Sequence, residues 1–138
     1  MTHPIAILAK HIDAAFTATT DPIGLLNAIR QELHRRSPVQ GQPVDFVRWV
    51  PIEKVEPNQY NPNSVAAKEM QLLYTSILHD GYTQPIVTFY DAEKDRYVIV
   101  DGFHRYFTCK NNPDILERNH GRLPVVVVEK SINDRMAS

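Results

Sequence analysis

The chain has 138 residues, of which 43% are hydrophobic and 22% charged, and these values are typical of one globular domain. Its formal net charge of −1 disfavours a polybasic nucleic-acid coat or membrane binder. The single cysteine, Cys109, excludes an intrachain disulfide framework and a zinc site built on cysteine pairs.

Residues 1–40 are predicted to form a helical hairpin. The first helix spans residues 3–18, and its apolar stripe is Ile5, Leu8, Ile12 and Phe16. Asp21-Pro22 is a typical helix start, and the second helix closes at the basic residues 34–36. No apolar run is long enough to span a membrane and no signal-peptide pattern is present, so we expect a cytoplasmic protein.

Residues 37–45 form a predicted linker to the main domain, which we place at 46–130. This domain opens with a strand over 46–50, and residues 51–55 continue as extended chain or a turn. Two prolines and three asparagines make 56–63 a structured loop. The last residues, 131–138, are expected to begin a C-terminal helix or tail.

The second half of the domain alternates strands and helices. A helix is predicted from the N-cap Ser64 to Gly81, followed by a β-hairpin over 85–100. A further helix, a short helical or irregular segment and a buried strand then follow at 103–110, 113–120 and 123–129. The predicted fold class is therefore α+β.

The strongest local signal is the junction after the strand at 98–100. That strand ends at Asp101-Gly102 and turns directly into a helix with His104 and Arg105 in its first turn. A helix N-terminus offers unpaired amides and partial positive charge, and arginine binds phosphate bidentately. The pattern predicts a phosphate pocket; the alternative is an N-cap, a tight turn and a surface ion-pair partner.

Three stretches in order resemble the ParB/sulfiredoxin superfamily. They are residues 50–55 leading into Asn58–Pro62, the run Gly81–Val87 with its Gln-Pro-Ile triplet, and the Gly-x-x-Arg box within 100–105. The resemblance covers about residues 46–130 and implies a small mixed sheet with packed helices. Within the superfamily the chain is most similar to the short IbrB-like co-activator proteins.

The resemblance implies a site for CTP or ATP. The Gly-x-x-Arg box would hold the phosphates, and the glutamine-proline turn and asparagine-proline loop would lie beside the nucleotide. Magnesium is expected with the nucleotide, with Asp101 as its ligand. The residues implicated in nucleotide binding are Thr83, Gln84, Pro85, Ile86, Gly102, Phe103, His104, Arg105 and Asn61.

Departures from the family pattern narrow the chemistry. The arginine that often follows the asparagine-proline loop is missing near Asn61, which argues against ParB-type hydrolysis. Phe103 stands where sulfiredoxins carry their reactive cysteine, so reduction of cysteine sulfinic acid is not expected. The chain stops before the region where ParB proteins carry a DNA-reading helix-turn-helix, so direct DNA binding has little support.

Two function classes remain open. The first is a nucleotide-dependent regulatory switch, in prophage or mobile-element gene regulation, with a phosphoadenosine-phosphosulfate-reductase-like partner and homodimerisation through the hairpin. The second is a nucleotide hydrolase or a serine-type small-molecule kinase, since Asp-Gly-x-His-Arg also resembles the box of free-serine kinases. Glu56, Asp101 and His104 would then be catalytic. A nuclease reading lacks a two-metal acidic cluster.

Overall fold

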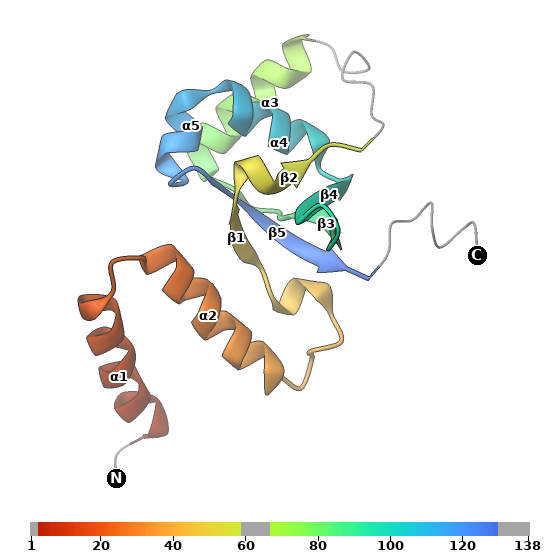
Figure 1. Cartoon of the computed structure of the whole chain (residues 1–138). Coiled ribbons are helices and arrows are strands. Elements are labelled where there is room, and N and C mark those ends of the chain that lie inside the picture. Colours follow the sequence, from red (N-terminus) through yellow and green to blue (C-terminus); the bar gives the residue numbers. More distant parts are fainter. Residues whose placement is uncertain (1–2, 59–66, 130–138) are drawn as a thin grey trace.

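The structure, a computed structural model, describes residues 3–58 and 67–129. In chain order its elements are α1 (Pro4–Ala18), α2 (Pro22–Arg35), the 3₁₀ turn η1 (Pro43–Asp45), β1 (Arg48–Pro51), the 3₁₀ turn η2 (Ile52–Lys54), β2 (Val55–Glu56), α3 (Ala67–Asp80), β3 (Ile86–Asp91), β4 (Arg96–Asp101), α4 (Phe103–Asn111), α5 (Pro113–Arg118) and β5 (Arg122–Val128) (Figure 1). This is the α+β class that the sequence predicts.

The strands form one mixed sheet in the order β1-β5-β3-β4-β2. β1 pairs with β5 and β3 with β4 in antiparallel fashion, whereas β3–β5 and β2–β4 are parallel. β1 and β2 lie at opposite edges, yet only the three residues of η2 separate them. A flat sheet would place these edges about 19 Å apart, and four residue steps reach at most about 14 Å. The sheet must therefore curl, which brings the β1 edge towards β4.

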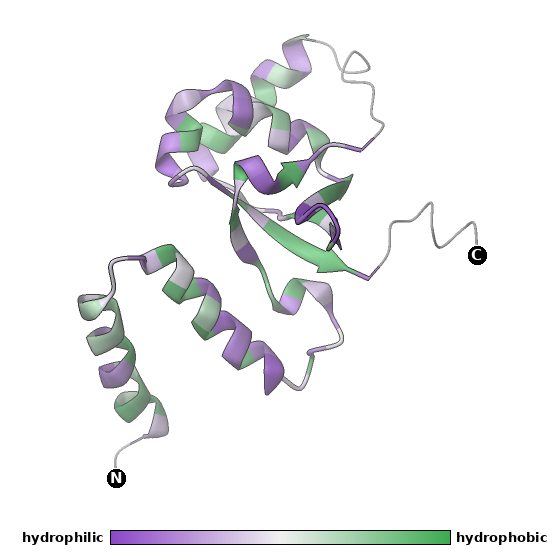
Figure 2. Ribbon diagram, viewed as in Figure 1, coloured by the Kyte–Doolittle hydropathy of each residue, from purple (hydrophilic) through white to green (hydrophobic). Residues whose placement is uncertain are grey.

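The core lies between the sheet and helices α3, α4 and α5. Its fully enclosed side chains come from both layers and include Ile86, Ile115, Leu123 and Val125, each 0% exposed. In Figure 2 the interior strand β5, between β1 and β3, is green along most of its length, since its sequence is nearly continuous aliphatic residues. A strand buried between two neighbours needs this composition, as the prediction for 123–129 anticipated.

The two N-terminal helices begin where their capping residues predict. The backbone amide of Gly24 donates to Asp21 Oδ1 at 3.1 Å, and Pro22 occupies the first helical position. α1 has no fully buried residue, and large apolar side chains stay exposed along it: Ile5, Ile7, Leu8 and Phe16. The predicted stripe on the first helix is thus present and largely uncovered within the described residues.

α2 is attached to the free edge of β1. The side chain of Asn27 donates from Nδ2 to the Trp49 carbonyl at 2.8 Å and accepts the Trp49 amide on Oδ1 at 2.9 Å. Arg30 adds a bond to the Val47 carbonyl at 3.2 Å. An uncovered edge strand would offer these groups to another chain, so α2 protects the edge.

Replacing Asn27 by alanine should lower the free energy of unfolding by about 1–3 kcal/mol, because two partly buried backbone groups of Trp49 lose their partners. Urea denaturation monitored by circular dichroism measures this loss. Gln31→Ala, at an exposed position one turn further along α2, is the control and should leave the midpoint unchanged. Equal midpoints for Asn27→Ala and the wild type would contradict the prediction.

Polar contacts tie α3 to α5. The Tyr74 hydroxyl donates to Asp114 Oδ2 at 2.6 Å, and this bond holds the pKa of Asp114 below its ordinary value. Arg118 donates to the carbonyls of Ile77 and Leu78, at 2.6 and 2.9 Å, at the end of α3. These bonds give α3 and α5 a polar rim beside the apolar core.

The Tyr74–Asp114 bond predicts an acid-dependent contribution to stability. Because the pKa of Asp114 is lower in the folded state, its stabilisation is complete above the ordinary pKa of about 3.9 and disappears as the pH falls through the folded-state pKa. Tyr74→Phe should thus flatten the fall in unfolding free energy below about pH 4. Urea titrations at several pH values measure the slope, and Asp114→Asn should reproduce the effect. Parallel slopes for wild type and Tyr74→Phe would exclude it.

The structure differs from the sequence prediction at several boundaries. The strand predicted for 46–50 begins at Arg48, because η1 occupies residues 43–45. The segment 51–55 contains η2 and the start of β2, a two-residue strand too short to show a hydrophobic period. Trp49 is half-buried, on the edge strand β1. Residues 131–138 lie outside the described residues.

Candidate functional site

The turn between β4 and α4 lies at one end of the sheet. Asp101 ends β4, Gly102 adopts φ 106° and ψ 22°, and Phe103 starts α4. The first intrahelical bond runs from the Tyr106 amide to the Gly102 carbonyl at 3.1 Å. The amides of the first helical turn therefore point towards the Asp101–Gly102 end, where a helix presents partial positive charge.

Gly102 is required here by both conformation and space. A positive φ of this size is strained for any other residue. A Cβ at this position would also stand 3.0 Å from Arg105 Nη2 and 3.3 Å from the Ile86 Cα. The turn thus packs directly against the start of β3 on one side and the guanidinium group of Arg105 on the other.

Arg105 folds back along its own helix towards Gly102. Its backbone carbonyl accepts a hydrogen bond from the Tyr82 hydroxyl at 2.7 Å, which holds the first turn of α4 in place. Its Nε is buried and has no hydrogen-bond partner among the described residues. A buried guanidinium nitrogen without an acceptor is costly, and an oxyanion at the helix N-terminus would satisfy it.

The predicted glutamine-proline turn lies beside this junction. β3 begins at Ile86 and runs antiparallel to β4, with Val87 opposite Asp101. Ile86 is fully buried and forms the floor next to Gly102. Pro85 is half-buried, and Thr83 and Gln84 are exposed. The structure therefore brings residues 83–86 together with residues 101–105.

Phe103 and His104 take different positions in the first turn of α4. The Phe103 side chain is 8% exposed and packs in the core, where its ring stacks on Phe107 at 5.7 Å. Only the backbone of Phe103 can therefore face a ligand. His104 is half-buried, and its ring meets the edge of Phe103 at 5.7 Å.

Asp101 is the carboxylate at this turn, and its side chain is exposed. Within residues 3–58 and 67–129 no cluster of three or more His, Cys, Asp or Glu residues could hold a metal ion by itself. Magnesium commonly takes one or two protein carboxylates and completes its shell with phosphates and water. A single carboxylate at a turn would fit that pattern if a phosphate were bound beside it.

Glu56 lies away from the turn. It is opposite Val98 in the β2–β4 ladder, three residues before Asp101. Its Oε1 is 3.8 Å from Lys94 Nζ, in the loop at the other end of β4, and its Oε2 is buried without a hydrogen-bond partner in the described part of the chain. The structure does not bring this carboxylate together with Gly102 and Arg105.

Three further residues bear on the candidate site: Asn61, Tyr82 and Cys109. Asn61 lies outside the described residues. Tyr82, which sequence reasoning did not single out, supports Arg105, and burial raises its pKa. Its place directly before the predicted glutamine-proline turn was the available signal. Cys109 is 0% exposed, and burial raises the pKa of its thiol, as expected for a core residue.

The curled mixed sheet and the glycine turn at a helix N-terminus define a ParB/sulfiredoxin-like domain. The sequence model of the ParB N-terminal domain matches residues 36–137, and the chain belongs to that family. The superfamily predicted from the three sequence stretches is therefore confirmed, and the nearness to IbrB-like proteins stays a prediction. Among the described residues no helix is long and apolar enough to cross a membrane.

A curated relative and two solved structures are similar to this chain. The uncharacterized protein YbdM of Escherichia coli K12 is 44% identical over 118 residues, which are 86% of this chain and 56% of YbdM. The chain thus spans little more than half of that relative. The truncated ParB of Caulobacter crescentus with CTP-γ-S is 24% identical, with a TM-score of 0.49 over 63% of this chain and 46% of ParB. Sulfiredoxin of Arabidopsis thaliana is 16% identical, with a TM-score of 0.48 over 66% and 93%.

Proposed function

We propose that this domain binds a nucleoside triphosphate, CTP or ATP, at the turn between β4 and α4. The observation that carries the proposal is the Arg105 side chain, whose buried Nε finds no partner among the residues that the structure describes and whose Nη2 lies against Gly102. A helix N-terminus and a guanidinium group converge there, and both favour phosphate. The exposed Thr83 and Gln84 would contact the rest of the nucleotide.

Magnesium would accompany the triphosphate and neutralise part of its charge. Asp101 is the residue that would hold the ion, since its exposed carboxylate adjoins the turn. Asn61 would contact a phosphate or a metal-bound water from the asparagine-proline loop. His104 would supply a second side-chain donor beside Arg105.

We propose that the bound nucleotide acts as a regulatory switch. Glu56, a base candidate, has its carboxylate beside Lys94 and away from the turn, which favours binding over turnover. The second candidate function is a nucleotide hydrolase or small-molecule kinase. The exposed Asp101 carboxylate directly before Gly102 supports it, because a base or metal ligand belongs at that place.

In this proposal the protein is cytoplasmic, and its nucleotide-bound state controls binding to partner molecules. We propose a phosphoadenosine-phosphosulfate-reductase-like protein and a second copy of this chain as partners, in the regulation of mobile-element genes, with DNA as a further target. The apolar side chains Ile5, Leu8 and Phe16, exposed by 37–60% along the stripe of α1, support self-association, because identical apolar faces complement one another. Light scattering on the wild type and Leu8→Glu would measure it, and a monomeric wild type would exclude the dimer.

A thermal-shift screen tests the binding proposal. ATP, CTP, GTP, UTP and ADP are compared with and without Mg²⁺, because a ligand that binds only the folded state raises the melting temperature. We expect a selective, magnesium-dependent rise for one triphosphate. No shift with any nucleotide would overturn the proposal. Release of phosphate from the selected nucleotide would favour the enzyme over the switch.

A further inference from the structure

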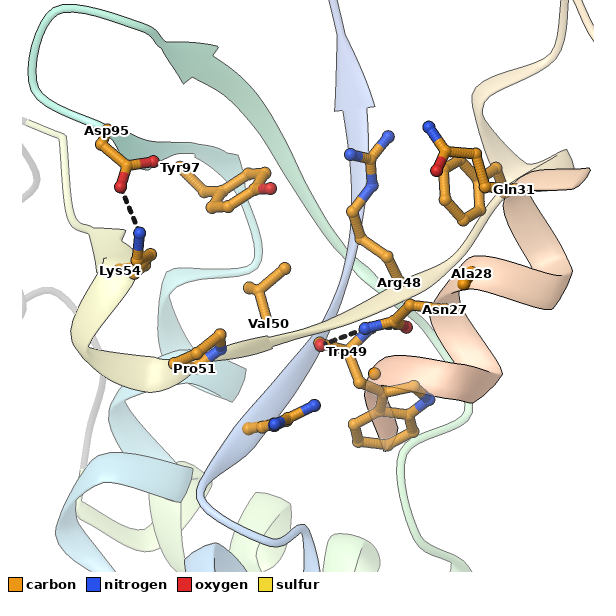
Figure 3. A pocket seen from close by; sticks show the side chains of 13 residues that line it. Asn27, Ala28, Gln31, Arg48, Trp49, Val50, Pro51, Lys54, Asp95 and Tyr97 are labelled. Carbon is orange, nitrogen blue, oxygen red and sulfur yellow. Dashed lines mark hydrogen bonds and ion pairs between the residues drawn. The ribbon is translucent and has the colours of Figure 1, made fainter. Parts of the chain in front are cut away.

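A hollow lies far from the turn at Gly102. Its volume is about 420 Å³, and α2, β1, η2 and the start of β4 surround it (Figure 3). Asp95 and Tyr97 lie at the beginning of β4, just before and just inside the strand, whereas Asp101 ends that strand and Gly102 follows it. The hollow therefore opens where the curl of the sheet brings the β1 edge opposite β4, and the two sites are separate.

The charges around the hollow are unbalanced. Three cationic residues and one acidic residue line it: Arg48, Lys54, Arg122 and Asp95. Lys54 is paired with Asp95, and Arg122 lies 3.6 Å from Asp21 Oδ1. Arg48 has no ion pair with any described residue, and its Nε is buried without a hydrogen-bond partner. Within the described part of the chain, Arg48 is thus the cation of this hollow that forms no ion pair.

Neighbouring groups hold Arg48 in place without neutralising it. Its guanidinium carbon lies 4.3 Å from the centre of the Phe46 ring, which fixes the plane of the group. Asp45, next to Phe46, is engaged with His34 Nδ1 at 2.6 Å. A half-buried guanidinium group with an unsatisfied nitrogen is stabilised by a planar oxyanion that accepts its parallel donors.

The remaining walls suit an apolar body. Figure 3 shows the Arg48 and Tyr97 side chains on the same side of β1, with Val50 between them. Ala28 and the Trp49 backbone continue the wall towards α2. The volume falls within the usual range for small-molecule sites, in which a few polar groups orient a ligand held by apolar and aromatic surface.

We propose that this hollow binds a small organic anion, with its carboxylate or phosphate on Arg48 and a flat apolar body against Tyr97 and Val50. Because the site lies between α2 and the sheet, the ligand joins the helical hairpin to the main domain. Binding here is independent of the nucleotide proposal, since neither Gly102 nor Arg105 takes part.

The single tryptophan of the chain, Trp49, follows Arg48 directly in β1 and is one of the residues around the hollow, so its indole gives a nearby fluorescence signal. Benzoate and phenyl phosphate are the probes, and benzyl alcohol is the uncharged control of similar shape. We expect one or both anions to change the Trp49 emission saturably, and benzyl alcohol to give no saturable change. Benzoate alone would identify a carboxylate site and phenyl phosphate alone a phosphate site.

Variants locate the signal. Arg48→Gln should weaken the anion response about tenfold or more, because charged hydrogen bonds are lost. Arg48→Lys keeps the positive charge but loses the two parallel N–H donors of the guanidinium group. Its affinity for the anion should therefore lie between those of Arg48→Gln and the wild type. Arg35→Gln, on an exposed arginine of α2, and Arg105→Ala should both bind as the wild type does. No saturable response, equal binding of benzyl alcohol, or full binding by folded Arg48→Gln and Arg48→Lys would overturn the proposal.

Discussion

We expect the variant Arg105→Ala to lose nucleotide binding while its domain stays folded. The substitution removes the guanidinium group that lies against Gly102 at the N-terminus of α4. The loss of two charge-assisted hydrogen bonds to phosphate should weaken nucleotide binding about a hundredfold or more. Isothermal titration calorimetry with the triphosphate selected in the screen measures the loss.

The fold should tolerate this change because the side chain contributes little to it. Arg105 Nε has no partner to lose among the described residues, and the bond from the Tyr82 hydroxyl goes to the backbone carbonyl, which alanine retains. We expect the free energy of unfolding to change by less than about 0.5 kcal/mol. Arg96→Ala, on the strand that leads into the turn, is the matched control and should bind normally. Equal affinity of Arg105→Ala and wild type would remove the phosphate role from this turn.

The candidate site could be predicted from sequence because its parts are local. A buried strand, Asp101-Gly102 and a helix with Arg105 in its first turn occupy consecutive positions, so the chain order alone places them together. The hairpin over 85–100 then brings residues 83–86 to the same end of the sheet as Asp101, since antiparallel strands joined by a short turn align their outer ends. The Asp21-Pro22 helix start was equally local.

Features that depend on long-range register could not be predicted in this way. β2 has two residues and becomes a strand only because β4 pairs with it. That pairing also fixes Glu56 opposite Val98 and leaves its carboxylate beside Lys94, away from the turn. No spacing along the chain carries this information, so the sequence suggested a catalytic neighbour that the sheet places elsewhere.

The hollow beside Arg48 could not be predicted from the sequence either, because it too depends on long-range contacts. Its walls come from α2, β1 and β4, which meet because η2 crosses between the sheet edges in three residues. Arg48 lies in an ordinary strand pattern, and nothing adjacent in the sequence distinguishes it from a surface arginine. That its buried Nε has no hydrogen-bond partner among the described residues becomes visible only when the surrounding elements are in place.

Gly102→Ala should lower both the free energy of unfolding and the affinity for the nucleotide. Gly121→Ala is the comparison that separates backbone strain from the close contacts of the new Cβ. Both glycines have positive φ, 106° and 74°, so alanine is strained at each, by about 1–3 kcal/mol. A Cβ at Gly121 has no atom within 4 Å, so strain is the whole effect there. At Gly102 the new Cβ also meets the Ile86 Cα and Arg105 Nη2, which adds a packing cost and displaces the guanidinium group.

The two variants therefore differ in what they lose. We expect Gly121→Ala to lower the unfolding free energy and keep the wild-type affinity for the triphosphate. Gly102→Ala should lower the unfolding free energy further and weaken nucleotide binding at least about tenfold, because Arg105 moves out of line with the first-turn amides. Urea denaturation and calorimetry on both proteins measure the two quantities. Wild-type affinity in folded Gly102→Ala would show that the close approach of Gly102 and Arg105 is not what holds the phosphate.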